Sequence, residues 1–212
     1  MEISVFSFLK AFMKIKAIAL VLSMLAASAA NANVINNGNF ESGLSGWTYT
    51  GNVNTAVFSG SYFGGGSNAL NGTTMIAFNA GDQAANGVLA QAFATTAGTS
   101  YTVKFDYGTN TSTQSITWGA YSATNAVLAS NFITDTNASG LLNTYTYTFT
   151  ATGSSTTLRF TDYAANNTYS IDGLLDNVSV NANPAAVPEP ASLALLGLGM
   201  LGLGMSRRRK AA

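Results

Sequence analysis

Apolar and polar positions alternate through the middle of the chain, and this pattern predicts β-strands almost throughout it. Residues 101–107 alternate strictly, with aromatic and valine side chains on one face. Residues 144–150 do the same, with aromatic side chains inward and threonines outward. Further strands are expected at 34–40, 47–49, 55–58, 75–78, 88–93, 115–121, 127–132, 156–162 and 170–180.

Turn-forming residues separate these segments. They are Asn37-Gly38, Gly64-Gly65-Gly66, Asn71-Gly72, Asn86-Gly87, Ala97-Gly98 and Thr152-Gly153-Ser154. Glycine and asparagine tolerate the backbone conformations that tight turns require. No stretch between them shows helical periodicity. About ten short strands punctuated by turns predict an all-β fold, a two-sheet antiparallel sandwich of the jelly-roll kind.

The N-terminal segment, residues 1–32, has the three parts of a secretory signal peptide. Lys14 and Lys16 precede an apolar core at 17–25, and Ala30-Asn31-Ala32 provides a small-residue cleavage site. Counting from Met13 gives a signal of ordinary proportions, so Met13 is expected to be the true start. The apolar core is too short to span a membrane. The segment is therefore expected to be a signal helix and not a transmembrane helix.

The C-terminal segment, residues 187–212, also has three parts. The tetrapeptide Val187, Pro188, Glu189, Pro190 comes first, and an uncharged apolar run at 191–205 follows it. A basic cluster ends the segment: Arg207, Arg208, Arg209 and Lys210. As a helix of ~1.5 Å per residue, the apolar run would fall short of a ~30 Å hydrocarbon core. Its four glycines weaken it further.

This order of Pro-Glu-Pro, short glycine-rich apolar helix and arginine cluster resembles the PEP-CTERM sorting tail of Gram-negative bacteria. The resemblance implies cleavage near Pro188–Pro190 by an exosortase-type membrane protease, and export in organisms that make exopolysaccharide. It also implies that the inner membrane holds the chain only transiently, with the basic cluster on the cytoplasmic side. The alternative is an ordinary tail anchor or stop-transfer segment, which the length and glycine content disfavour.

The intervening chain is read as one domain at 33–180 and a linker at 181–186. The whole sequence has no cysteine and no histidine. Disulfides are therefore excluded, as are nucleophile–histidine arrangements and the commonest metal ligand. Between residues 33 and 186 the bases are Lys104 and Arg159, against seven acidic residues. This negative balance argues against a nucleic-acid partner.

Both ends of the domain carry a second resemblance. Asn36-Asn37-Gly38-Asn39-Phe40-Glu41 and Gly46-Trp47 open it, and Leu175-Asp176-Asn177-Val178-Ser179-Val180 closes it. With residues 88–93 and 98–106, these motifs look like the galactose-binding-like jelly rolls of many carbohydrate-binding modules and secreted bacterial proteins. The resemblance bears on fold more than on ligand, since function has to be argued from the site.

Glu41 and Asp176 are carboxylates inside apolar stretches at opposite ends of the domain. In the resembling family the first and last strands lie side by side and often share a structural calcium ion. Two carboxylates and several loop carbonyls could supply the six to eight oxygens that calcium requires. The alternative is that both carboxylates accept backbone N–H groups or face solvent.

Sugar binding would need exposed aromatic side chains. The candidates are Tyr62 and Phe63, beside the glycine-rich loop, and Trp118 and Tyr121 on one predicted strand. Alternation places Trp118 on the same face as Ile116, which favours a buried position, and puts Tyr121 on the other face. Tyr62 and Phe63 could equally pack beneath their loop.

Taken together, the chain is expected to be an exported, non-catalytic protein of the cell surface or extracellular matrix, associated with exopolysaccharide. The alternative is a carbohydrate-binding module with a defined glycan ligand. A polysaccharide-active enzyme comes third, and would need a carboxylate pair drawn from Asp106, Asp162, Asp172 and Asp176.

Overall fold

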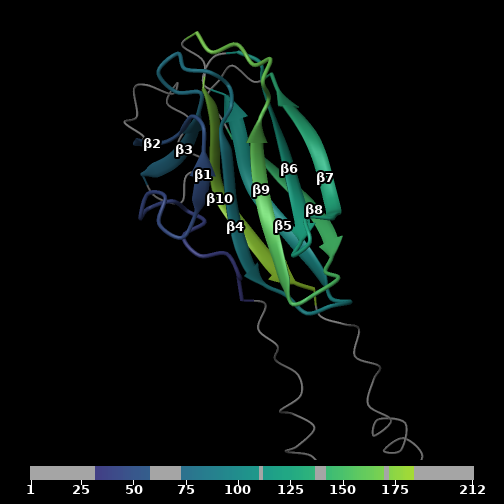
Figure 1. The fold of residues 1–212 in the computed structure, drawn as a ribbon. Coiled ribbons are helices and arrows are strands. Elements are labelled where there is room, and N and C mark those ends of the chain that lie inside the picture. Colours follow the sequence, from purple (N-terminus) through teal and green to yellow (C-terminus); the bar gives the residue numbers. More distant parts are fainter. Residues whose placement is uncertain (1–31, 58–72, 110–111, 137–141, 170–171, 184–212) are drawn as a thin grey trace, which may run out of the picture.

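Two antiparallel sheets of five strands each pack face to face in the computed structural model, which describes residues 32–57, 73–109, 112–136, 142–169 and 172–183 (Figure 1). The first sheet has the order β1-β4-β9-β6-β7 and the second the order β2-β3-β10-β5-β8. The predicted all-β, two-sheet antiparallel sandwich is thus confirmed. The strands are β1 (Thr48–Thr50), β2 (Val53–Val57), β3 (Thr74–Phe78), β4 (Val88–Ala94), β5 (Ser100–Thr109), β6 (Gln114–Ser122), β7 (Val127–Asp135), β8 (Asn143–Thr150), β9 (Ser155–Asp162) and β10 (Gly173–Ala182).

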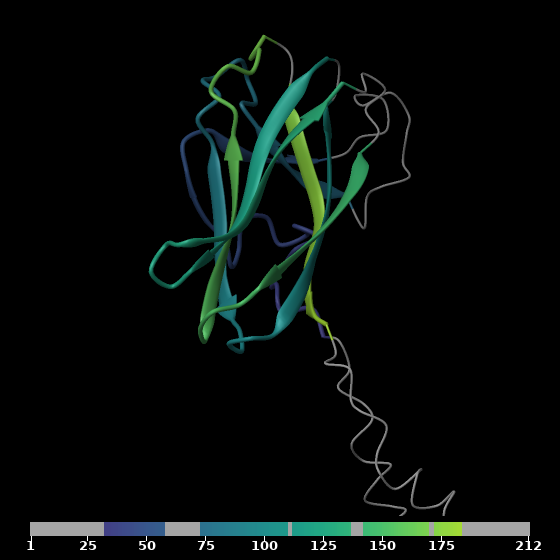
Figure 2. The ribbon, with the colours of Figure 1, turned by 90° about the vertical axis from the view of Figure 1, so that its right-hand side faces the viewer.

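The last strand is central to the second sheet. β10 lies between β3 and β5, so it pairs with strands that precede it by many residues. From β3 onward, successive strands alternate between the two sheets, except that β6 and β7 are neighbours in the first sheet. The amide of Val34 donates to the carbonyl of Val180, so both ends of the described chain leave the sandwich at the same end (Figures 1 and 2).

The strand predicted at 34–40 is wrong. Asn37 and Phe40 have φ angles of 50° and 54°, which an extended strand does not allow. The Asn37 side chain instead builds a turn, donating to the carbonyls of Gly43 and Ser45 and accepting from the amide of Ser42. These local bonds compete with strand pairing, as asparagine side chains often do.

This N-terminal turn segment, residues 33–40, is nevertheless attached to both sheets. The buried Gln91 side chain of β4 accepts from the amide of Asn36 and donates to its carbonyl. On the other side, the amide of Val178 in β10 donates to the carbonyl of Gly38. The segment therefore ties the first sheet to the second, at the end of the sandwich where the chain enters and leaves.

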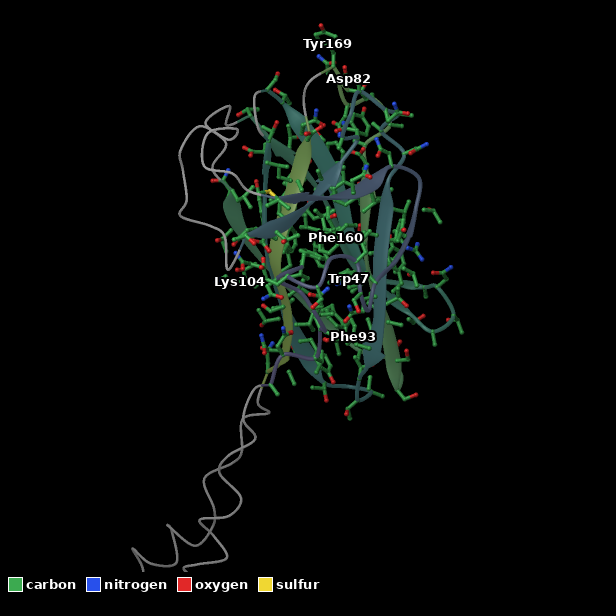
Figure 3. The ribbon with its side chains drawn as sticks, turned by 90° about the vertical axis from the view of Figure 1, so that its left-hand side faces the viewer. Trp47, Asp82, Phe93, Lys104, Phe160 and Tyr169 are labelled. Carbon is green, nitrogen blue, oxygen red and sulfur yellow. The ribbon has the colours of Figure 1, made fainter. Side chains whose placement is uncertain are left out.

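The core between the sheets is aromatic. Phe105 of β5 packs edge-on against Phe160 of β9, with ring centroids 5.0 Å apart, and is fully buried. Trp47 lies 6.5 Å from Phe160 and 5.3 Å from Phe40, which extends the ring contacts to the N-terminal turn segment. Figure 3 shows Phe93, Trp47 and Phe160 following one another between the sheets. The inward face expected for β5 is confirmed.

Several expectations fall outside the described residues. These are the signal segment, the aromatic pair Tyr62 and Phe63, and the sorting tail with its apolar helix. The expected linker begins two residues too early, because β10 continues through Ala182. Within the described ranges there is no helix long and apolar enough to cross a membrane.

Gly38 should not tolerate a side chain. A Cβ added there would overlap the Val178 carbonyl oxygen, so the turn segment would be pushed off β10. We expect Gly38→Ala to lower the free energy of unfolding by roughly 1–3 kcal/mol, the usual cost of overpacking. The matched control is Gly153→Ala, because a Cβ at Gly153 meets nothing within 4 Å. Chemical denaturation of the two variants tests this, and equal midpoints would contradict it.

Candidate functional site

The two aromatic candidates on β6 have different environments. Trp118 is 1% exposed, and its ring stacks on Tyr147 at 4.7 Å between the sheets. The expectation that Trp118 could bind sugar is therefore wrong, because the pleat of β6 turns its side chain inward together with that of Ile116. Tyr121 lies on the opposite, outward face and is partly exposed, as alternation predicted.

The outward surface of three neighbouring strands of the first sheet forms the strongest candidate for a binding surface. We name it the β6–β7–β9 face and define it by Thr117, Gly119, Tyr121, Ser130, Phe132, Thr157, Arg159, Thr161 and Tyr163. The register pairs Gly119 with both Ser130 and Arg159, and pairs Thr117 with Phe132 and Thr161. Hydroxyl groups thus lie in the middle and at both ends of this surface, and the rings of Phe132 and Tyr121 lie at opposite ends.

At one end of the β6–β7–β9 face, an arginine lies over a tyrosine ring. The Arg159 guanidinium carbon is 4.3 Å from the ring centroid of Tyr121. The same ring lies over Gly119, where an added Cβ would come within 2.6 Å of it. Arg159 also donates to the side chain of Asn125 at 3.1 Å. The guanidinium is held in place by these contacts, and its planar array of donors can serve sugar hydroxyls.

At the other end, two aromatic rings are exposed together. Phe132 of β7 is 50% exposed and Tyr163, directly after β9, is 45% exposed. Their centroids are 5.1 Å apart with an interplanar angle of 77°, an edge-to-face pair. From Thr117, opposite Phe132, to Tyr121 the strand advances four residues, roughly 13 Å at the usual rise. The two ends of the face could therefore contact the same short oligosaccharide.

Sequence reasoning did not single out Phe132, Tyr163 or Arg159. Alternation from Ile133, an apolar residue of the same segment, would have placed Phe132 outward. Phe132 and Ile133 are adjacent apolar residues, however, and alternation alone does not tell which of the two faces the core. Tyr163 lies beyond a strand end, where periodicity carries no information.

Glu41 directly follows the turn segment, and its side chain binds the residues at the start of β3. Its Oε1 accepts the amides of Thr73 and Thr74 at 2.8 and 2.7 Å, and its Oε2 accepts the hydroxyl of Thr73 at 3.3 Å. These hydrogen bonds, with that from the Thr74 amide the strongest, hold the pKa of Glu41 below its usual value. The expected alternative, a carboxylate that accepts backbone N–H groups, describes this arrangement.

Asp176 is fully buried in β10, and its Oδ1 accepts the amide of Asn177 at 2.7 Å. It follows Leu175, which pairs with Ile76, so it lies toward the start of β3 where Glu41 binds. Across the other neighbour it is directly opposite Asp106. Over the described ranges, no group of three or more His, Cys, Asp or Glu side chains gathers as a metal centre. Calcium at Glu41 and Asp176 stays a prediction.

The four carboxylates considered for catalysis do not share one environment. Asp106 and Asp176 belong to the second sheet, and Asp106 accepts from Thr144 and Asn177. Asp162 ends β9 in the first sheet and accepts from Asn166 at 2.7 Å. Burial raises the pKa of Asp162 to about 6, and burial also raises the pKa of Asp172. Since Asp176 is fully buried, it is not accessible to a polysaccharide.

A polar pocket of about 650 Å³ lies on the outward side of the second sheet. The turn segment forms one wall, with Asn37, Gly38 and Asn39, and strands β5, β8 and β10 form the floor. It is on the opposite side of the sandwich from the β6–β7–β9 face. In Figure 3, Lys104 marks this side.

Several solved structures have a fold similar to that of the sandwich. It is similar to the carbohydrate-binding module TmCBM61, solved with β-1,4-galactotriose, at 18% identity and a TM-score of 0.53, over 72% of this chain and 99% of that chain. The CBM22-1 xylan-binding domain of Paenibacillus barcinonensis Xyn10C matches at 14% identity and a TM-score of 0.51, over 76% of this chain and 100% of that one. The MgGH51 α-L-arabinofuranosidase matches at 17% and 0.53, over 72% of this chain and 26% of the enzyme. At these identities the likeness concerns the fold.

Sequence comparison gives one further result. No curated protein sequence matches the chain. Residues 186–210 match the PEP-CTERM protein-sorting motif, a stretch that includes both the Pro-Glu-Pro tetrapeptide and the basic cluster. The presence of this motif implies that the protein is exported and sorted. The chain thus carries a PEP-CTERM protein-sorting motif at its C-terminal end, and a β-sandwich domain similar to carbohydrate-binding modules.

Proposed function

We propose that this protein is an exported, non-catalytic glycan-binding protein that associates with extracellular polysaccharide through the β6–β7–β9 face. The observation that carries the proposal is the exposed Phe132–Tyr163 ring pair on a sheet face that also presents Arg159 and several threonine and serine hydroxyls. Exposing two aromatic rings to water is unfavourable unless a partner covers them. Their presence on an otherwise polar surface therefore favours a binding role.

The chemistry of the face suits a sugar chain. Sugar rings have apolar C–H surfaces and peripheral hydroxyls, so they need both aromatic contact and hydrogen-bonding groups. Phe132 and Tyr163 supply the first, and Arg159 with Thr117 and Thr161 supplies the second. The similarity to modules solved with galactotriose or named for xylan supports this class of ligand.

The sorting tail explains how such a domain would reach polysaccharide outside the cell. An exosortase-type protease would cut near Pro188–Pro190 after the apolar run has held the chain in the inner membrane. Because β10 ends beside the start of the described chain, both ends of the described chain lie at one end of the sandwich, and the β6–β7–β9 face lies along a side of the sandwich (Figure 1). The face would therefore stay accessible while the chain is held.

A non-catalytic role is supported by where the acidic residues lie. The β6–β7–β9 face contains no Asp or Glu among its defining residues. Asp106 has both carboxylate oxygens occupied by hydrogen bonds, and Asp176 is buried beneath the surface. Glycoside hydrolysis needs two carboxyl groups that flank an accessible bond.

The ring pair should determine glycan affinity. We expect Phe132→Ala and Tyr163→Ala each to weaken binding about tenfold or more, since each removes a large apolar contact. Isothermal titration against the native exopolysaccharide, β-1,4-galactan and xylan measures this. Tyr169→Ala is the matched control, because Tyr169 is 77% exposed and lies at the top of the molecule in Figure 3, outside the residues that define this face. Unchanged affinity in both ring variants would refute the site, and no saturable binding would refute the function.

The termini should be processed on export. We expect the exported protein to begin near Asn33 and to lack residues 207–210, because the signal and the sorting tail are both removed. Intact mass spectrometry of the exported protein tests this. Replacing Pro188-Glu189-Pro190 with alanines should leave the tail attached. Recovery of Arg207–Lys210 on the mature wild-type protein would exclude sorting by cleavage.

Calcium should stabilise the fold if Glu41 and Asp176 hold it. Asp176 directly opposite Asp106 places like charges across two strands, which a cation would relieve. Calcium at a hundredfold excess over its Kd would add about 2.7 kcal/mol to the free energy of unfolding. The melting temperature should rise with calcium and fall with chelator, and Asp176→Asn should abolish the response while Asp82→Asn keeps it. A wild-type melt that is insensitive to chelator would overturn the proposal.

A further inference from the structure

The polar pocket on the second sheet owes its shape to an irregularity in β10. The β10–β5 register shifts between Asp176 and Ser179, and Asn177 has a φ of 53°. This bulge turns the Asn177 side chain toward β5, where its amide donates to Asp106 at 2.7 Å. The turn segment is hydrogen-bonded to β10 just after the bulge, through Val178 and Gly38. A bulge of this kind re-aims side chains, and here it opens a hollow beside the N-terminal turn segment.

Three polar side chains in this pocket keep their hydrogen-bonding capacity. Lys104 of β5 lies directly opposite Ser179 of β10, and Asn39 comes from the turn segment. None of these three side chains makes a hydrogen bond or an ion pair with a residue that the structure describes. The pocket therefore presents an ammonium group, an amide and a hydroxyl that are available to a ligand.

Lys104 and Asp106 are the two charged residues that line the pocket, and the described residues show no ion pair between them. Asp106 is on the same side of β5, but its Oδ1 accepts from Thr144 and its Oδ2 from Asn177. Asp106 is also buried, whereas Lys104 is exposed. The Lys104 ammonium is thus the exposed charge of the pocket, with the Asn39 amide and the Ser179 hydroxyl also in the lining. This arrangement favours a ligand that offers a carboxylate to Lys104 and hydroxyls to its neighbours.

We propose that this pocket is a second ligand site, which takes an acidic sugar residue such as a uronate. Its volume of about 650 Å³ is within the ~300–1,000 Å³ range of small-molecule sites. Lys104 would bind the carboxylate, and Asn39 and Ser179 would bind hydroxyls. The choice of a sugar, rather than another carboxylate, rests on the proposed function; the presence of a site does not.

Two sites on opposite sides of one sandwich make the protein bivalent. The β6–β7–β9 face and the pocket belong to different sheets, so one polysaccharide residue cannot contact both. Each molecule could then join two chains, or two segments of one chain, and the gain in avidity would need no new contact. A non-catalytic protein of this kind would cross-link the polysaccharide in which it lies.

The test compares a neutral and an acidic trisaccharide of the same size. β-1,4-Galactotriose probes the β6–β7–β9 face, and trigalacturonate probes the pocket, by titration of the full chain in detergent at fixed calcium. We expect Lys104→Met to weaken trigalacturonate binding by roughly tenfold or more, because a charge-assisted hydrogen bond is lost. Lys104→Arg should retain most of the affinity. High salt should weaken the acidic ligand alone.

The matched variant on the other side is Phe132→Ala. It should leave trigalacturonate binding unchanged while galactotriose binding falls, which separates the two sites. If galactotriose binding is absent but the Lys104 effect is present, the proposed function fails and the pocket stands. If trigalacturonate does not bind, or binds equally to Lys104→Met, the pocket is not an acidic-sugar site. If lactate binds as tightly as trigalacturonate, the sugar assignment is overturned.

Discussion

The contact on which the rest of the structure depends is the edge-to-face packing of Phe105 against Phe160 between the two sheets. Phe105 also stacks on Tyr145 and Tyr147, and lies against Trp118, so one β5 side chain joins the two sheets and the neighbouring strand. Aromatic groups in contact with several partners carry much of the burial in a domain without disulfides. The chain has no cysteine, so sheet-on-sheet packing must supply the stability.

The N-terminal turn segment depends on this core and completes it. Phe40 of this segment packs on Trp47, which in turn lies against Phe160, and the Trp47 indole N–H donates to the carbonyl of Asn37. Its polar backbone is satisfied by Gln91 of one sheet and by β10 of the other. An irregular segment can be buried only when its amides and carbonyls find partners, and here each sheet provides some of them. The same segment then forms one wall of the pocket on the second sheet.

The two outward surfaces of the sandwich differ because the two sheets are irregular in different ways. On the β6–β7–β9 face the register shift lies near Tyr121, and Gly119 leaves room for that ring beneath Arg159. On the second sheet the bulge at Asn177 opens a polar hollow instead. Local departures from regular pairing therefore shape the pocket and the Tyr121 end of the β6–β7–β9 face.

The sequence by itself determined the fold class, most strand positions, the inward faces of β5 and β8, and the sorting tail, because each depends on local periodicity or on a contiguous motif. It placed Trp118 and Tyr121 on opposite faces, which the structure bears out. Only the tertiary structure decided that residues 34–40 form a turn segment, that Phe132 meets Tyr163, and that Lys104 lies in a pocket with Asn39. The physical reason is that these features depend on register shifts, on left-handed residues such as Asn37 and Asn177, and on contacts between strands distant in sequence. Alternation predicts which side of a strand a residue faces, but it does not predict what lies opposite.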